Sequence, residues 1–146
     1  MKLVVPFETS MDRLVVRRIV LLEAHVDGVT GWGECVAAEA PFYSPEYADT
    51  AWPVLRDFLW PMVKGRKFDS ACEVWNLLTR VRGHNMAKAC LEAAAWDAEA
   101  KQKGVPLAKL IGGTREEIAS GVSIGIKTEV GVLSSRMQAP YRAILL

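Results

Sequence analysis

The stretch from His84 to Gly113 constrains the fold of this 146-residue chain more than any other. Small and apolar residues recur through it at helical spacing, and neither Gly nor Pro interrupts them before Gly104. This spacing predicts one helix over residues 86–103, with Asn85 as its N-cap and Gly104 as a left-handed C-cap. Because alanine is the commonest residue in the pattern, the inner face of the helix can approach other backbones closely. We therefore expect this helix to be the central and most buried one.

Patterns before this helix predict a hairpin and two more helices. Alternating apolar residues on both sides of Asp27-Gly28 predict an antiparallel hairpin over residues 14–37. Apolar residues three and four apart predict helices over residues 45–59 and 70–82. Pro53 lies inside the first of these helices and should kink it.

The two ends of the chain are less regular. Residues 6–10 are predicted to form a loop, because Pro6 cannot donate a ladder hydrogen bond, and any strand before it is short or absent. Residues 116–126 are predicted to be extended, with glycines near the end of the run.

Composition excludes several classes of function. A net charge of +1 gives no electrostatic reason to bind nucleic acid or an anionic membrane surface. No stretch approaches the ~20 apolar residues of a membrane span, and the N-terminus lacks the apolar segment of a signal peptide. Cysteines without metal-ligand spacing predict buried, reduced thiols and a cytoplasmic protein; they are Cys35, Cys72 and Cys90.

Several motifs, in this order along the chain, resemble the enolase superfamily. They are Gly31-Trp32-Gly33-Glu34, Ala95-Trp96-Asp97, and the run from Pro106 to Gly113. Residues 84–89 and 121–126 are similar to the o-succinylbenzoate synthase / N-acylamino acid racemase branch. The resemblance implies an α+β fold: an enolase-like N-terminal capping domain, in which an antiparallel hairpin or meander precedes a helical bundle.

The resemblance also implies a domain organisation. Residues 1–115 would form the capping domain, and residues 116–126 would be the remnant of the first strand of a (β/α) barrel. Residues 127–146 depart from the family pattern as an atypical tail, and Leu145 stands where the first of two barrel lysines would be. On this comparison the chain is truncated before most of the barrel.

The chemistry of the resembled enzymes belongs to that barrel. There, two lysines move a proton at the carbon beside a carboxylate, and three carboxylates hold the Mg²⁺ that stabilises the resulting enediolate. The resemblance therefore assigns no catalytic residue and no metal ligand to this chain, and Mg²⁺ to the full-length family only. It implies o-succinylbenzoate synthesis, N-acylamino acid racemisation or both in the full-length family, acting on a small carboxylate. We expect this chain alone to be inactive and to supply only the lid over the substrate.

The resemblance assigns substrate contacts to two capping-domain loops and one barrel strand. Phe7 and Met11 would lie in the first loop, and Phe42 and Tyr43 in the second, over residues 38–43. Ser123 would donate to a substrate carboxylate. The simpler alternatives are that Phe7 and Met11 pack beneath a loop and that Ser123 bonds to backbone.

Two further possibilities remain open. The chain could be a non-catalytic binding or interaction module derived from a capping domain. Sequencing the DNA beyond Leu146 would distinguish such a module from a truncated enzyme. Apolar residues without a barrel to join also predict self-association or a homo-oligomer through edge pairing; they are Ile118, Val122, Ile124 and Ile126.

Overall fold

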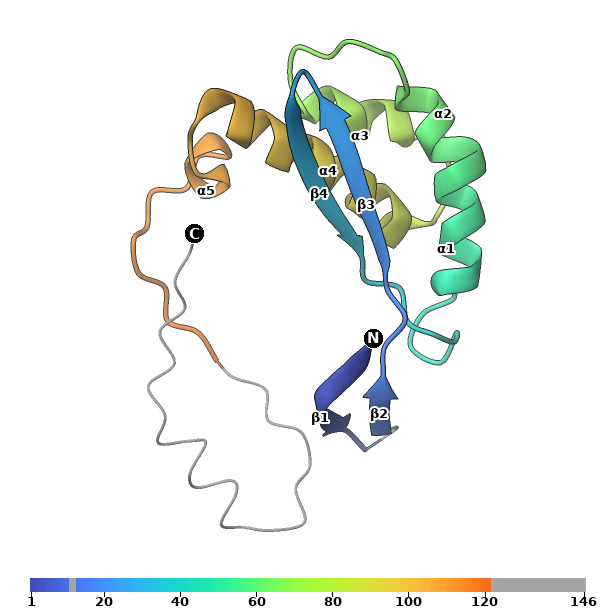
Figure 1. Cartoon of the computed structure of the whole chain (residues 1–146). Coiled ribbons are helices and arrows are strands. Elements are labelled where there is room, and N and C mark those ends of the chain that lie inside the picture. Colours follow the sequence, from blue (N-terminus) through green and yellow to red (C-terminus); the bar gives the residue numbers. More distant parts are fainter. Residues whose placement is uncertain (11–12, 122–146) are drawn as a thin grey trace. The chain divides into compact units, whose positions relative to one another are not determined.

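The computed structural model describes residues 1–10 and 13–121, and these residues divide into two compact units. The first comprises residues 1–17 with the described residues from Gly113 onward, and the second is Arg18–Gly112. All helices of the described residues lie in the second unit (Figure 1). None of these helices is long and apolar enough to cross a membrane.

In the first unit, strand β1 (Lys2–Glu8) pairs antiparallel with β2 (Arg13–Val16). The register is regular near Phe7, which lies opposite Leu14, but shifts between Lys2 and Phe7. The predicted loop is therefore wrong for residues 6–8. Pro6 lies in the irregular stretch, where the register gives it no partner and its missing N–H interrupts no regular ladder.

In the second unit, β3 (Val20–Val26) and β4 (Val29–Cys35) form an antiparallel hairpin. Asp27 and Gly28 connect them with φ angles of 45° and 84°, the positive values that two-residue hairpin turns require. The predicted hairpin is confirmed here. Its predicted start at residue 14 is wrong, because residues 13–16 belong to β2 and pair with β1.

The helices differ from prediction mainly at their ends. They are α1 (Ala48–Val54), the π-helical segment η1 (Leu55–Leu59), α2 (Trp60–Val63), α3 (Cys72–Leu78), α4 (Asn85–Lys103) and α5 (Leu107–Leu110). The predicted helix 45–59 starts later and continues to Val63. Pro53 lies in α1, shortly before the π-helical segment. Because proline has no N–H group to donate, the regular i→i−4 hydrogen-bond ladder of the helix is interrupted at Pro53. The predicted helix 70–82 ends at Leu78, followed by a turn in which the Thr79 hydroxyl donates to the Asn76 carbonyl.

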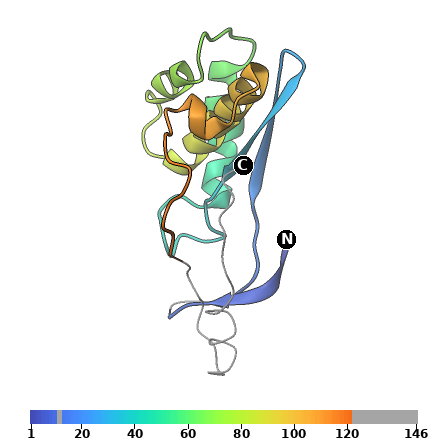
Figure 2. The ribbon, with the colours of Figure 1, turned by 90° about the vertical axis from the view of Figure 1, so that its left-hand side faces the viewer.

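Helix α4 is the central helix, as predicted. Ala87, Cys90 and Ala94 on its inner face are fully buried. Leu59 and Leu78 complete the core, and burying each contributes about 1.5–3 kcal/mol to the free energy of unfolding. The helices of this unit lie on one face of the β3–β4 hairpin (Figure 2).

Two sequence expectations about α4 and the cysteines are wrong. Asn85 is not the N-cap, because the helix begins after His84, which has a left-handed φ of 51°. Cys35 and Cys90 are buried as expected, but Cys72 is exposed because it starts α3 on the surface.

Residues 116–121 contain no strand, and Ile118 is exposed. The rest of the expected barrel strand and the whole tail lie outside the described residues. Self-association through them stays a prediction.

Candidate functional site

The frame of the site is the contact between β4 and α4. Methyl groups built at Gly31 and Gly33 would collide with the helix backbone, at the carbonyl groups of Ala94 and Cys90. The methyl carbon built at Gly31 would also lie 2.8 Å from the Ala98 side chain. Only glycine on the strand and small residues on the helix allow this approach, which explains both the Gly-x-Gly pattern and the alanines of α4.

A polar clamp locks the register of this contact. The carboxylate of Asp97 on α4 accepts a hydrogen bond from the Trp32 N–H at 2.8 Å. Lys101 donates to the same carboxylate at 2.6 Å and to the Thr30 carbonyl at 2.8 Å. Burial raises the pKa of Asp97, but the hydrogen bonds from Lys101 and Trp32 outweigh it and leave that pKa lowered.

The loop after β4 carries the exposed aromatic side chains. Phe42 and Tyr43 are 84% and 87% exposed, although large aromatic residues are usually at least partly buried. The ends of the loop are joined: Ala38 forms a parallel bridge with Tyr47, and the Ala48 N–H donates to the Ala38 carbonyl at 2.9 Å. The loop therefore projects its aromatic tip from a closed base.

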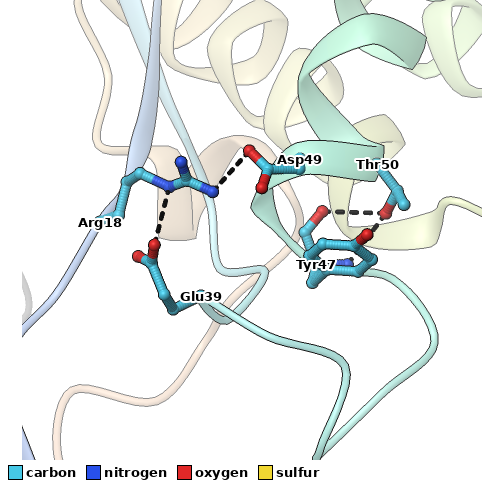
Figure 3. A network of polar contacts seen from close by, with 5 residues as sticks. All are labelled: Arg18, Glu39, Tyr47, Asp49 and Thr50. Atoms are coloured by element: carbon cyan, nitrogen blue, oxygen red, sulfur yellow. Dashed lines mark hydrogen bonds and ion pairs between the residues drawn. The ribbon is translucent and has the colours of Figure 1, made fainter.

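Side chains reinforce this base (Figure 3). Arg18 lies between Asp49 and Glu39, with nitrogen–oxygen distances of 2.6 Å and 3.4 Å. Thr50 caps the start of α1 by accepting from the Tyr47 N–H and donating to the Tyr47 carbonyl. The Arg18 pairs are exposed and contribute at most about 1 kcal/mol each, so they orient the loop more than they stabilise the fold.

Glu46 ties the same loop to α4. It is 8% exposed, and its carboxylate accepts the N–H groups of Met86 and Ala87 at 2.9 and 2.7 Å. A negative charge at a helix N-terminus also interacts favourably with the helix dipole. Glu46 thus supplies the cap expected of Asn85, from a distant part of the chain.

The other predicted contact residues lie elsewhere. Phe7 is in β1 of the first unit and is 41% exposed. Met11 and Ser123 lie outside the described residues. Phe42 and Tyr43 are brought together on one loop, and the remaining assignments stay predictions.

The described residues do not fit a catalytic metal. Within residues 1–10 and 13–121, no three His, Cys, Asp or Glu side chains are grouped so that they could hold one. Burial raises the pKa of the Cys35 thiol, and that of Cys90 to about 12, so neither is a ready nucleophile or thiolate ligand at neutral pH.

An antiparallel hairpin packed against a central helix, with further helices beside it, is the α+β arrangement expected of a capping domain. The chain belongs to the family of mandelate racemase / muconate lactonizing enzyme N-terminal domains, whose model matches residues 1–112. It has the N-terminal capping fold of the enolase superfamily, as the sequence motifs indicated.

Within that family the chain is similar to o-succinylbenzoate synthases and N-succinylamino acid racemases. It is 45% identical over 127 residues to the o-succinylbenzoate synthase of Bacillus subtilis, covering 86% of this chain and 34% of that protein. It is 42% identical over 126 residues to an Amycolatopsis N-succinylamino acid racemase, with the same coverage of both chains. The chain thus spans about a third of the length of these relatives.

Solved structures are also similar to this chain in fold. An enolase-superfamily member from Listeria innocua matches with a TM-score of 0.80 and 36% identity, covering 93% of this chain and 37% of that one. A muconate lactonizing enzyme from Pseudomonas fluorescens, in complex with muconolactone, matches with a TM-score of 0.72 and 26% identity.

Sequence reasoning missed the residues that hold the loop in place. Arg18 follows Arg17 in a short basic stretch, and Glu46 looks like an ordinary acid at the start of a helix. No local pattern marks either residue, because their partners are distant in sequence. Asp97 is marked only by the family motif Ala95-Trp96-Asp97.

Proposed function

We propose that this domain is the substrate-facing cap of an enzyme with o-succinylbenzoate synthase or N-succinylamino acid racemase activity. The carrying observation is the exposed pair Phe42 and Tyr43 on a loop whose base is pinned to α1 and α4. Exposed aromatic groups on a firm base suit a lid that excludes water and contacts the apolar part of a substrate.

Further contacts in this proposal come from outside that loop. As the resemblance implies, Phe7 and Met11 would add apolar contacts, and Ser123 would donate to a carboxylate of the substrate. The substrate class is a small carboxylate, in keeping with the names of the similar proteins.

The reacting groups would be supplied by a barrel. In the resembled enzymes that barrel holds Mg²⁺ and the proton-transferring lysines, and the described residues offer no site for the metal. This domain would contribute specificity and exclusion of water, without holding the metal or moving the proton. We therefore expect the 146 residues expressed alone to show no racemisation or dehydration with Mg²⁺.

A chimera tests the proposal. Residues 1–112 replace the matching segment of the Bacillus subtilis relative, and kcat/KM is measured for both reactions in variants Phe42→Ala and Tyr43→Ala. Each should lower kcat/KM about tenfold, which corresponds to losing roughly 1.4 kcal/mol of contact with the bound substrate. Phe58→Ala, an aromatic residue on η1 that is 60% exposed, is the matched control and should change nothing.

Two results would oppose the proposal. An active chimera indifferent to both loop substitutions would show that the loop does not contact substrate. A folded but inactive chimera would favour the alternative of a non-catalytic binding module.

A further inference from the structure

A basic hollow lies between the end of α3 and the start of α4, within the second unit. It has a volume of about 460 Å³, in the size range of small-molecule sites. Its lining residues are Thr79, Arg80, Val81, Arg82, Gly83 and Lys88. Three of these six are cationic and none is acidic, so like charges gather here without a counter-charge in the wall.

Lys88 is the unusual member of this set. It is only 5% exposed, and lysine is almost never so deeply buried without an acidic partner. None of the ion pairs formed among the described residues includes Lys88. The buried carboxylate at the same end of α4, that of Glu46, is occupied by two backbone N–H groups.

The contacts of Lys88 satisfy its ammonium group incompletely. One of its three N–H donors reaches the Val81 carbonyl at 3.1 Å, and the charge lies 5.4 Å from the centre of the Trp75 ring. The carbonyl and the ring are weaker partners for a buried ammonium than a carboxylate is. Together they orient Lys88 at the wall of the hollow with donor capacity remaining.

The geometry points to a binding site for a small, multiply charged oxyanion, with phosphate as the simplest example. Lys88 would form the fixed inner contact, and the exposed guanidinium groups of Arg80 and Arg82 would close over the anion from outside. Guanidinium groups match oxyanions in a bidentate manner, and a bound anion would supply the missing counter-charge. The assignment is independent of the proposed capping function, since it uses neither the aromatic loop nor its base.

The test is a titration of the full chain with inorganic phosphate at constant ionic strength, followed by amide NMR shifts. The amides of Gly83 and Lys88 should shift saturably, and chloride should not reproduce the effect. Arg80→Gln/Arg82→Gln should weaken binding at least about tenfold, the loss expected for a charge-assisted hydrogen bond. Lys64→Gln/Arg66→Gln removes the same charge from exposed positions outside the hollow and should leave the dissociation constant unchanged.

Lys88→Met separates binding from a purely structural role of the lysine. The variant keeps an unbranched apolar side chain, one heavy atom shorter than lysine, and removes the charge. If Lys88 binds an anion, the Tm of the variant in phosphate-free buffer should equal or exceed that of the parent chain. Phosphate should then no longer raise the Tm of the variant. A variant that melts lower yet retains the full phosphate response would overturn the assignment. So would the absence of a saturable shift in the parent chain, or equal weakening in the Lys64/Arg66 control.

Discussion

Replacing Gly33 with alanine tests the contact on which the domain is built. The added methyl group would lie 2.9 Å from the carbonyl carbon of Cys90, and closer still to its oxygen. Ordinary van der Waals contacts begin near 3.4 Å, and the closer carbonyl oxygen sets the limit, so strand and helix must separate by more than about one ångström. The obstacle is helix backbone, which cannot rotate away as a long side chain could.

The cost follows from this geometry. Overpacking a core typically costs about 1–3 kcal/mol, and a collision between backbones belongs at or above the upper end. For a domain of about 100 residues, each kcal/mol lowers Tm by about 4–8 °C. We therefore expect Gly33→Ala to lower Tm by more than about 10 °C, measured by circular dichroism and checked by urea unfolding.

Two matched glycines separate collision from conformational strain. Gly121 has no neighbour within 4 Å and no positive φ, so Gly121→Ala should leave Tm unchanged. Gly28 also has open space but a φ of 84°, so Gly28→Ala should cost only the roughly 1–2 kcal/mol of a left-handed residue. If Gly33→Ala melts no lower than Gly28→Ala, the close approach of β4 and α4 is wrong.

Two further predictions concern titrating groups. The pKa values of Asp97 and Glu99 are lowered in the folded chain, so both ionised carboxylates stabilise the fold at pH values above their ordinary pKa near 4. The free energy of unfolding should therefore fall as the pH drops below that value. It should fall less steeply in the variants Asp97→Asn and Glu99→Gln. Equal acid sensitivity in parent and variants would show that other carboxyl groups control the transition. A thiol reagent at pH 8 should label exposed Cys72 quickly, but Cys35 and Cys90 only in denaturant, because burial raises the pKa of both buried thiols. Labelling is followed by mass spectrometry, and the control is Cys72→Ser, which should remain unlabelled in its native state. Rapid labelling of that variant would contradict the buried placement of Cys35 and Cys90.

Local patterns were sufficient to predict the hairpin and the central helix. The alternation around Asp27-Gly28 and the alanine spacing before Gly104 act over a few residues, and each requires only its own neighbours to be interpreted. Pro6 was misjudged because its position in a strand depends on an irregular register that only the partner strand determines. The end of α3 at Leu78 was missed because its apolar pattern continues into the following turn.

What no local pattern could reveal is that carboxylates accept hydrogen bonds from backbone N–H groups distant in sequence. Glu46 caps α4 across 40 residues, Glu99 accepts the Ala71 N–H at the start of α3 across 28, and Asp97 holds the Trp32 N–H across 65. A serine or asparagine cap would stabilise one helix only, whereas each of these carboxylates joins two segments of the chain. This arrangement has a consequence for the proposed lid. Tyr43 lies three residues before Glu46, whose carboxylate is buried against α4, and Ala38 is held by its bridge to Tyr47. Any conformational freedom of the aromatic tip therefore lies in residues 39–45, between these two anchors. In the proposed capping function, the loop would therefore present its aromatic side chains from a fixed base and adapt to a ligand mainly through their rotation.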